Sequence, residues 1–334
     1  MAAEYVGHLR TRDPLHAYLS HQVLPCMGVN GKSSSFRVFC LKDTKVYRYE
    51  ESRSGAQVVG KFFAHGRHDG YGAMERMRQE FENLQVLRGY GMATYPHQVV
   101  RPLGVNEALN GVLVEDYCGG STLCSFIRGA IHEQRERQLL AKLTALAYFL
   151  ATLHNRTANG HNVNFAEDCY YLDRLVKKLQ VTGIIGAWDA EEFYWLRDLW
   201  RDKPRMWEDR QVFVHGDATP SNFLFGRGLD VMAIDLERMR RADRVFDLGR
   251  IAGELQHFFI EATGNKYAAE PFIGHFLWEY ACHFPDRNRA FLALTARIPF
   301  QMALTLLRIA RNSWIDGPHR LRLVEEAKII LRTS

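Results

Sequence analysis

The sequence predicts an α+β chain in two parts, a small antiparallel sheet with one helix followed by a larger and mostly helical part. Short apolar stretches bounded by turn residues fill the first third of the chain, and the glycine pair Gly119–Gly120 ends that pattern. Beyond the glycines, apolar residues recur at helical spacing almost to the C-terminus. A chain of 334 residues is also long enough for two separate cores.

The composition describes an ordinary globular protein, with 47% hydrophobic and 24% charged residues. The net charge of +5 is mild and no long basic block is present, so a nucleic-acid partner is not expected. No run approaches the roughly 20 apolar residues of a membrane span, and the first residues carry charge where a signal peptide would be apolar. Six scattered cysteines without metal-binding spacing favour reduced thiols in a cytoplasmic protein.

The N-terminal part is predicted to be a five-stranded antiparallel sheet with one inserted helix. A short helix at Pro14–Gln22 precedes it. The expected strands are Phe36–Leu41, Lys45–Tyr49, Gln57–Phe63, Val99–Val105 and Gly111–Tyr117. The inserted helix is Met74–Arg88, in which Met77, Phe81 and Leu84 fall near one face.

The segment Gly31-Lys32-Ser33-Ser34-Ser35 invites comparison with the Walker A motif. That motif needs a glycine five residues before Gly31, where Cys26 stands, and a helix after the serines, so we reject this interpretation. Two interpretations stay open. The segment is either a loop whose backbone N–H groups and serines approach phosphates, or a solvated serine turn.

Lys61 stands among apolar neighbours in the third expected strand, and Glu80 lies beside the apolar face of the expected helix. An ion pair between them would orient the lysine towards phosphates. Glu82, on the solvent side of the helix, is the weaker candidate partner. Taken alone, each residue also fits an ordinary role, an edge lysine with its head in water or a surface charge on a helix.

A linker is predicted at Glu115–Gly120, which divides the chain into residues 1–117 and 118–334. The extended backbone from Glu115 to Cys118 offers donors and acceptors at the spacing of an adenine base, although a plain linker fits equally well.

The second part is predicted to be helical. Arg135–His154 has the strongest apolar stripe, and His154 in its last turn is expected to cap the helix rather than to act in catalysis. The further expected helices are Tyr170–Leu179, Ala190–Trp200, Asp247–Ala262, Pro271–Cys282, Arg287–Asn312 and His319–Arg332.

The stretch with the most chemical content runs from Val212 to Leu248. Two apolar runs, Phe223–Phe225 and Val231–Ile234, have the pattern of a β-hairpin. Polar residues flank them, Asp217 and Asn222 before the first run and Asp235 after the second. At one end of such a hairpin these oxygen atoms would surround a volume of the size that suits Mg²⁺, which prefers hard oxygen ligands. The pattern indicates a phosphoryl-transfer site.

These residues resemble the motifs of the aminoglycoside phosphotransferase and choline kinase family, which has a two-lobed protein-kinase-like fold. HGDATPSN at His215–Asn222 matches the family's H-G-D-x-x-x-x-N catalytic loop, and IDLE at Ile234–Glu237 stands where the family has its metal-binding aspartate. FDLG at Phe246–Gly249 matches a segment that packs beneath the loop. The resemblance covers about residues 30–260 and weakens in the C-terminal helices, where family members diverge by substrate.

The resemblance implies a role for each matching residue. Asp217 would accept or orient the proton of the acceptor hydroxyl, His215 would brace the loop, and Asp247 would anchor the loop backbone. Lys61, fixed by Glu80, would contact the phosphates of ATP. The residue patterns described above, and not the resemblance, add Ser33, Ser34 and Ser35 as candidates near the phosphates and Glu115, Tyr117 and Cys118 as candidates near the base. Mg²⁺ would be held by Asn222 and Asp235, with Glu237 as a further ligand or as a partner of Arg238 or Arg241.

The resulting expectation is an ATP- and Mg²⁺-dependent kinase for a hydroxyl of a small molecule, with sugars and amino sugars narrowly favoured over choline-like alcohols. The oligomeric state is not readable from the sequence. Two alternatives stay open: a nucleotide-binding pseudokinase that serves as a scaffold, and an unrelated hydrolase that uses Asp217 and His215.

Two sets of side chains bear on the acceptor, and each has two interpretations. The arginines are a solvated face, or they suit an anionic acceptor, as in lipopolysaccharide core-sugar kinases of the same fold. The late aromatic residues are core, or they box a quaternary ammonium. The arginines are Arg238, Arg240, Arg241, Arg244 and Arg250, and the aromatic residues are Phe272, Phe276, Trp278, Tyr280 and Trp314.

Overall fold

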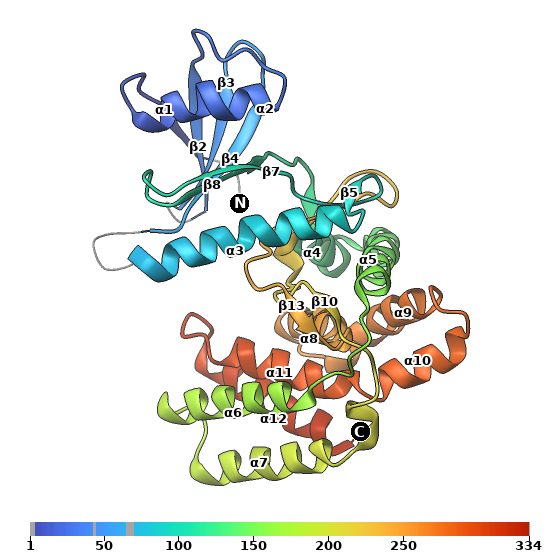
Figure 1. Ribbon diagram of the computed structural model, residues 1–334. Helices are drawn as coiled ribbons and strands as arrows, with labels where there is room; N and C mark the ends of the chain where they lie inside the picture. The colour runs from blue at the N-terminus through green and yellow to red at the C-terminus, as the bar shows by residue number, and fades with distance from the viewer. Residues whose placement is uncertain (1–3, 43–44, 65–69, 334) are drawn as a thin grey trace. The chain divides into compact units, whose positions relative to one another are not determined.

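The computed structural model describes residues 4–42, 45–64 and 70–333 (Figure 1). The chain divides into two compact units. Unit 1 comprises Met1–Gly119 and Met232–Glu237, and unit 2 comprises Gly120–Val231 and Arg238–Ser334. The assignment of nucleotide binding to residues 1–117, and of catalysis and acceptor binding to residues 118–334, stays a prediction.

Unit 1 contains a six-stranded antiparallel sheet with the strand order β1-β2-β3-β4-β8-β7 (Figure 1). The prediction of five strands missed β1, an edge strand whose residues are mostly exposed and whose pairing is irregular next to Gly7. Such a strand lacks the alternation of buried and exposed residues that marks a half-buried one. The strands are β1 (Glu4–His8), β2 (Phe36–Lys42), β3 (Val46–Glu51), β4 (Gln57–Phe62), β7 (Pro102–Asn106) and β8 (Val112–Asp116).

The predicted strand Val99–Val105 is wrong as a single element. Its first residue belongs to β6 (His97–Val99), which pairs with β5 (Ala93–Thr94), whereas its last residues belong to β7. The break falls before Pro102. Proline has no N–H group for a sheet hydrogen bond, so it is tolerated at the first position of a strand but not inside one.

The helices of unit 1 lie in two places. Residues 14–26 form α1 (Pro14–Tyr18), a turn of π-helix (Leu19–Val23) and α2 (Leu24–Cys26), whose apolar side chains join the core of the sheet. The inserted helix is α3 (Gly70–Gly89), which packs against β7 and β8. Met77 and Leu84 are fully buried, as is Leu87 one turn further, whereas Phe81 is half-buried. The predicted apolar face is confirmed, with Phe81 at its margin.

Unit 2 is mostly helical, as predicted. Two pairs of short strands accompany its helices: β10 (Val212–Val214) pairs with β13 (Arg240–Ala242), and β9 (Ser121–Thr122) pairs with β11 (Phe223–Phe225). The hairpin turn predicted after β11 is present, since Gly226 N–H donates to the carbonyl of Asp230 at 3.1 Å before β12 (Val231–Ala233) begins. The helices are α4 (Leu123–Glu133), α5 (Glu136–Thr157), α6 (Phe165–Val181), α7 (Ala187–Arg201), α8 (Val245–Thr263), α9 (Glu270–Ala281), α10 (Arg287–Thr295), α11 (Ile298–Ala310) and α12 (Gly317–Thr333).

The predicted helix Arg287–Asn312 is broken into α10 and α11, which meet at 44°. Pro299, in the first turn of α11, has no N–H to donate to the preceding turn, and its ring would collide with that turn in a continuous helix. Among the described residues, no single helix has the length and apolar composition of a membrane span, and α10 with α11 meets that criterion only as a bent pair.

Helix α8 lies at the centre of unit 2 and packs closely against α11 (Figure 1). Two glycines of α8 make this approach possible. A Cβ atom on Gly249 would lie 2.2 Å from Cβ of Gln301, and one on Gly253 would lie 2.7 Å from Cβ of Thr305. Because both neighbours are fixed helix positions, side chains at these glycines would force the two helices apart.

This packing predicts opposite effects for two glycine-to-alanine substitutions. Gly249→Ala should lower the free energy of unfolding by roughly 1–3 kcal/mol, because the added methyl group overpacks the α8–α11 contact. Gly274→Ala is the matched control: it lies inside α9 with no atom within 4 Å of the added Cβ. That substitution should stabilise the protein by roughly 0.5–1 kcal/mol through helix propensity. Urea unfolding of both variants checks this, and equal effects would contradict the packing argument.

Candidate active site

The segment His215–Asn222 follows β10 and ends in a 3₁₀ turn at Pro220–Asn222. Its course depends on Gly216, which has φ of +80°. A Cβ at this position would also lie 1.9 Å from the carbonyl oxygen of Arg238. Only glycine combines this backbone angle with such a close approach. The glycine of the HGD motif is therefore a requirement of the loop's shape.

The loop is held by the buried carboxylate of Asp247, in the first turn of α8. Asp247 Oδ2 accepts the N–H of His215 at 2.7 Å, and Oδ1 accepts the N–H of Gly216 at 3.2 Å. The resemblance implied this anchoring role. Burial by itself would raise the pKa of Asp247, but hydrogen bonds from His154 and from the His215 backbone outweigh burial and lower the pKa.

His154 supports the anchor from the other side. Its Nε2 lies 3.2 Å from Asp247 Oδ2, and its Nδ1 lies 2.9 Å from the Tyr280 hydroxyl, which also receives a hydrogen bond from Arg244 at 3.4 Å. Burial lowers the pKa of His154, so the ring is neutral and can donate to Asp247 and accept from Tyr280. The expected capping role is wrong, because the His154 ring is fully buried and both of its nitrogens contact other groups, Asp247 and Tyr280.

Asp217 carries its carboxylate on the partly exposed side of the loop, with 20% of the side chain accessible. Its N–H donates to Nδ1 of the buried His215 ring at 3.4 Å, so His215 contacts the loop backbone. The carbonyl of Asp217 accepts hydrogen bonds from Thr219 N–H at 2.7 Å and from Asn222 Nδ2 at 2.9 Å. The second bond directs the amide nitrogen of Asn222 to the loop backbone, and its Oδ1 accepts a hydrogen bond from Ser221 Oγ at 3.3 Å. An amide oxygen has two lone pairs, so one is left for a cation.

Arg308 on α11 contacts the Asp217 carboxylate, although no local pattern in the sequence marks this residue. Its Nη2 lies 3.3 Å from Asp217 Oδ1 and 3.3 Å from Glu254 Oε1 on α8. Burial raises the pKa of Glu254 to about 7. The positive charge of Arg250 opposes this shift, and the negative charge of Asp217 adds to it. Arg308 is 91 residues from Asp217 in the sequence, so only the packing of α11 on α8 brings them together.

Unit 1 contributes a second group of charges around Lys61. Lys61 Nζ lies 2.7 Å from Glu80 Oε1, the predicted pair, and 3.2 Å from Glu115 Oε2. Burial would lower the pKa of Lys61, but the carboxylates of Glu115, Glu80 and Asp235 outweigh it and raise the pKa. Burial raises the pKa of Glu80 to about 7 although Lys61 opposes this, and burial also raises the pKa of Glu115.

This group has more negative than positive charge. Three carboxylates act on one ammonium, and Glu115 Oε1 is buried without a hydrogen-bond partner among the described residues. Asp235 has φ of +66°, a strained value for a residue other than glycine, and the backbone after it is fixed by a 2.8 Å hydrogen bond from Asn83 Nδ2 to Leu236 O. An excess of carboxylate oxygens beside a fixed aspartate fits a divalent cation such as Mg²⁺. Glu237, half-buried, lies two residues further along the segment.

The predicted serine segment packs onto the N-terminal helices of unit 1. The Ser34 hydroxyl is buried, 2.5 Å from Ser20 Oγ, and the Ser34 carbonyl accepts from His16 Nε2 at 3.1 Å. Ser33 and Ser35 are exposed. The contacts expected between these serines and phosphates stay predictions.

At the expected base-binding segment, Tyr117 N–H donates to Gln57 O at 3.2 Å and Cys118 Sγ lies 3.7 Å from Asp116 O. The Glu115 side chain points to Lys61, with its Oε2 3.2 Å from Nζ. The roles of these three residues in nucleotide binding stay predictions.

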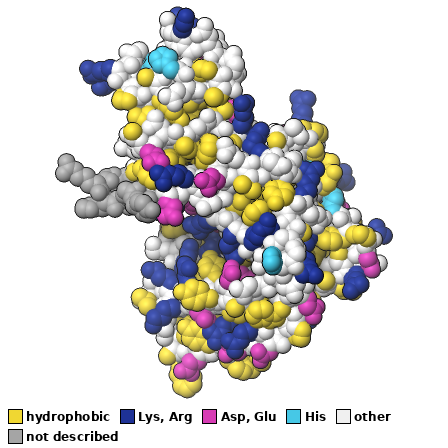
Figure 2. Space-filling model, in the orientation of Figure 1, with side chains coloured by type: hydrophobic (Ala, Val, Ile, Leu, Met, Phe, Trp, Pro, Cys, Tyr) yellow, Lys and Arg dark blue, Asp and Glu magenta, His cyan; other side chains and the backbone are white. Residues whose placement is uncertain are grey.

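The arginines that follow Asp235 mostly contact other residues of unit 2. On the face that Figure 2 draws, basic side chains are interspersed with acidic and hydrophobic ones. Arg240 lies 3.2 Å from Glu167, and Arg241 donates to Thr157 O at 2.9 Å. Arg244 and Arg250 are buried, so the expectation of a solvated face is wrong for these two. Both stack on aromatic rings of unit 2, Arg244 on Phe284 and Arg250 on Phe246.

The aromatic residues of the late helices are mostly core. Phe272, Phe276 and Tyr280 are buried, and Trp278 packs edge-on against Phe291, whereas Trp314 is exposed. These residues are spread over the core and the surface of unit 2, so they do not form one aromatic box.

Comparison with known proteins gives a consistent result. The model of the phosphotransferase enzyme family matches residues 42–282. The solved ethanolamine kinase of Plasmodium vivax is similar, with a TM-score of 0.61 and 13% identity over 96% of this chain and 88% of that chain. A choline kinase of Streptococcus pneumoniae has a TM-score of 0.52 and 16% identity over 88% and 92% of the two chains.

Aminoglycoside 2'-phosphotransferase-IIIa, solved as a GDP complex, has a TM-score of 0.53 and 17% identity over 86% of this chain and 91% of that chain. The comparison with curated proteins found no match. At these identities the solved structures show the fold, and they confirm the predicted two-lobed protein-kinase-like architecture.

The charge group around Lys61 predicts a pH-dependent loss of stability. Lys61→Met leaves Glu80 and Glu115 buried without their cation, which should cost roughly 3–5 kcal/mol of unfolding free energy at pH 8. Since these folded-state pKa values lie above the ordinary value of a glutamate, the penalty is small while the groups are protonated and grows as pH rises through about 7. Urea unfolding at pH 5.5 and pH 8 measures the difference. The exposed Lys177→Met serves as control, and an equal loss at both pH values would contradict this explanation.

The carboxylate of Asp247, which anchors the loop, predicts a loss of stability at low pH instead of high pH. Asp247→Asn should lower the free energy of unfolding by roughly 3 kcal/mol at pH 7, because the buried N–H groups lose a charged acceptor. The folded protein holds the pKa of Asp247 below its ordinary value near 4, so the wild type has this contribution above about pH 4 and loses it as pH falls. The two proteins should therefore converge towards pH 3. Exposed Asp202→Asn is the control. A difference in unfolding free energy between wild type and Asp247→Asn that stays constant from pH 7 to pH 3 would contradict the anchoring role of Asp247.

Proposed function

Because the chain belongs to the phosphotransferase enzyme family, and is a phosphotransferase with an alcohol group as acceptor, we propose that it is an ATP- and Mg²⁺-dependent kinase of small molecules. It transfers the γ-phosphate to a hydroxyl group of a sugar, an amino sugar or an amino alcohol. The family match bears out the resemblance to aminoglycoside phosphotransferases and choline kinases. It leaves no support for the hydrolase alternative.

The observation that carries the proposal is the loop at residues 215–222. Its backbone is bound by the buried Asp247 carboxylate, while Asp217 presents a partly exposed carboxylate. Phosphoryl transfer passes through a loose transition state, so the protein contributes chiefly positioning and charge neutralisation. An anchored loop with one accessible carboxylate supplies the positioning for an acceptor hydroxyl.

In this proposal Asp217 accepts a hydrogen bond from the acceptor hydroxyl and takes its proton as the phosphate is transferred. Arg308 is a positioning residue, because its guanidinium lies between the Asp217 and Glu254 carboxylates and limits the rotation of both. His215 keeps the loop backbone in place through its contact with the Asp217 N–H.

Nucleotide binding is proposed for unit 1. Lys61, oriented by Glu80 and Glu115, would contact the phosphates. The GDP complex of aminoglycoside 2'-phosphotransferase-IIIa supports a nucleotide, and a comparison of ATP with GTP decides which one this chain prefers. Mg²⁺ would be held by Asn222 and Asp235, with Glu237 as a further candidate, and would neutralise phosphate charge.

Acceptors that carry an amino group fit best. The relatives named above act, by their names, on ethanolamine, choline or an aminoglycoside, all of which are cationic, and a glucosamine kinase with a TM-score of 0.52 adds an amino sugar. In this chain Asp217 and Glu254 already share one cation, Arg308. A second cation, the ammonium of an acceptor, would be stabilised by the same two carboxylates.

A kinase needs a compartment that supplies ATP, so we propose a cytoplasmic location. The six scattered cysteines all lie among the described residues and form no disulfide there, which is compatible with that proposal.

Asp217→Asn tests the proposal. Transfer of ³²P from γ-labelled ATP should be seen with at least one of glucosamine, ethanolamine, choline, glucose and kanamycin, and the variant should lower kcat roughly 10²–10⁴-fold because the proton acceptor is lost. Nucleotide affinity should be unchanged. Asp202→Asn, an exposed carboxylate, is the matched control. Nucleotide binding without transfer to any acceptor, or transfer that does not depend on Asp217, would favour the scaffold alternative.

A further inference from the structure

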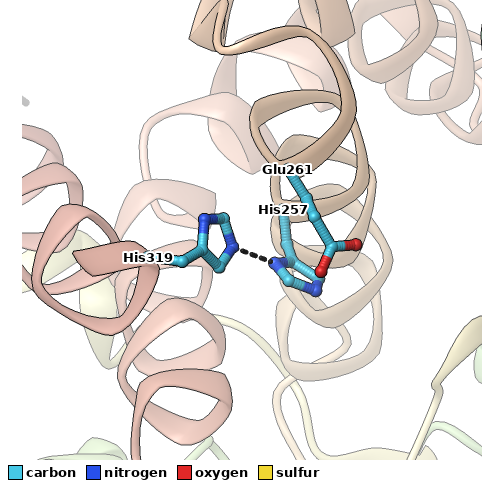
Figure 3. A group of neighbouring side chains, drawn as sticks. All are labelled: His257, Glu261 and His319. Carbon is cyan, nitrogen blue, oxygen red and sulfur yellow. Dashed lines mark hydrogen bonds between the residues drawn. The ribbon is translucent and has the colours of Figure 1, made fainter. Parts of the chain in front are cut away.

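Three potential metal ligands meet in unit 2 at a place that the proposed kinase does not use. His257 and Glu261 lie on α8, and His319 lies near the start of α12 (Figure 3). One ring nitrogen of each histidine and one carboxylate oxygen all lie within 4.8 Å of one another. Glu261 follows His257 by four residues, so both side chains project from the same face of α8. Figure 3 shows the His319 ring turned towards them from the neighbouring helix.

The distances are compatible with direct coordination. His257 Nδ1 and His319 Nε2 are 3.1 Å apart. Two nitrogen ligands at about 2.0–2.1 Å from a tetrahedral zinc ion are separated by about 3.3 Å. The separation of the two nitrogens is therefore close to that of two zinc ligands, and the rings need to turn until both lone pairs point at the ion. Glu261 is the exposed member of the group, so its side chain can rotate to close the remaining distance.

The three side chains have few competing interactions. Among the described residues, neither ring has a second hydrogen-bond partner, and Glu261 has no ion pair. In the hydrogen bond between His257 and His319 one ring nitrogen donates and the other accepts, so the accepting nitrogen already has a lone pair. Binding then requires a change of tautomer in the donating ring.

The end of α8 and the start of α12 also affect the electrostatic potential where an ion would bind. His257 and Glu261 lie in the last two turns of α8, where the exposed carbonyl groups favour positive charge. His319 lies in the first turn of α12, whose N–H groups oppose it, but Asp316 accepts the N–H of His319 at 2.9 Å and supplies a compensating carboxylate. The local field therefore does not exclude a divalent ion.

We propose that His257, Glu261 and His319 bind one divalent transition-metal ion of the zinc type, with water in the fourth position. Two imidazoles and a carboxylate suit Zn²⁺ or Co²⁺, whereas Mg²⁺ prefers oxygen ligands only. The ion ties the end of α8 to the start of α12. This site is separate from the Mg²⁺ ligands proposed above and does not depend on the kinase proposal.

The simpler alternative is a hydrogen bond between two histidines that joins the helices. It explains the 3.1 Å distance, but it gives no role to Glu261. The two hypotheses differ in their response to Glu261→Gln, because this exposed residue can be changed without disturbing the buried pair.

Cobalt is the probe that separates this site from an oxygen-ligand site. Full-length protein stripped with EDTA is titrated with Co²⁺ alone, then with Zn²⁺. Four-coordinate Co²⁺ with imidazole ligands absorbs strongly in the visible range, whereas six-coordinate Co²⁺ on oxygen ligands absorbs weakly. The expected result is one strongly absorbing Co²⁺ per chain, displaced by Zn²⁺. Glu261→Gln should weaken its binding roughly 10–100-fold or more, since even loss of a supporting group has that effect.

His319→Ala should abolish the absorption, and His161→Ala, an exposed histidine outside the cluster, should leave it unchanged. Circular dichroism confirms that each variant is folded. If His319→Ala fails to fold, Glu261→Gln alone decides the question. The proposal is overturned if the wild type shows no intense band, or if the band persists unchanged in Glu261→Gln.

Discussion

The buried carboxylate of Asp247 is the interaction on which the candidate site of unit 2 depends. It accepts two backbone N–H groups of the loop and a hydrogen bond from His154, and α8, which carries it, packs through Gly249 and Gly253 against α11. The same packing brings Arg308 to Asp217. The position of the accessible carboxylate therefore follows from how closely two helices approach, and not only from the residues of the loop.

In unit 1 the main electrostatic feature is the group of charges around Lys61. Two buried glutamates hold the ammonium of Lys61 in one orientation, which suits the phosphate contact proposed for it. Burial raises the pKa of Glu80 to about 7, and the neighbouring carboxylates of Glu115 and Asp235 act in the same direction. Such a site is most stable when a cation is close, so the arrangement that orients Lys61 also favours a divalent ion.

The sequence was sufficient where a contact depends on local order. The pair of Lys61 with Glu80 and the buried face of α3 were predictable, because strand and helix periodicity places each residue on a known side. The loop His215–Asn222 was predictable from the resemblance of its motif to that of the family. It was insufficient where a contact depends on tertiary packing. Nothing local marks Arg308, and His154 has the position of a capping residue although it serves the anchor. The break between α10 and α11 was predictable in principle from Pro299.

The anchor of the loop recognises peptide groups rather than side chains. Every residue except proline provides an N–H, so Asp247 imposes almost no demand on which amino acid occupies position 215, and the demand for glycine at position 216 comes from the Arg238 carbonyl instead. A fixation of this kind tolerates mutational drift in the side chains around it. Enzymes that share such an anchor can therefore exchange acceptor-binding residues on neighbouring helices over evolutionary time while the reacting geometry is retained.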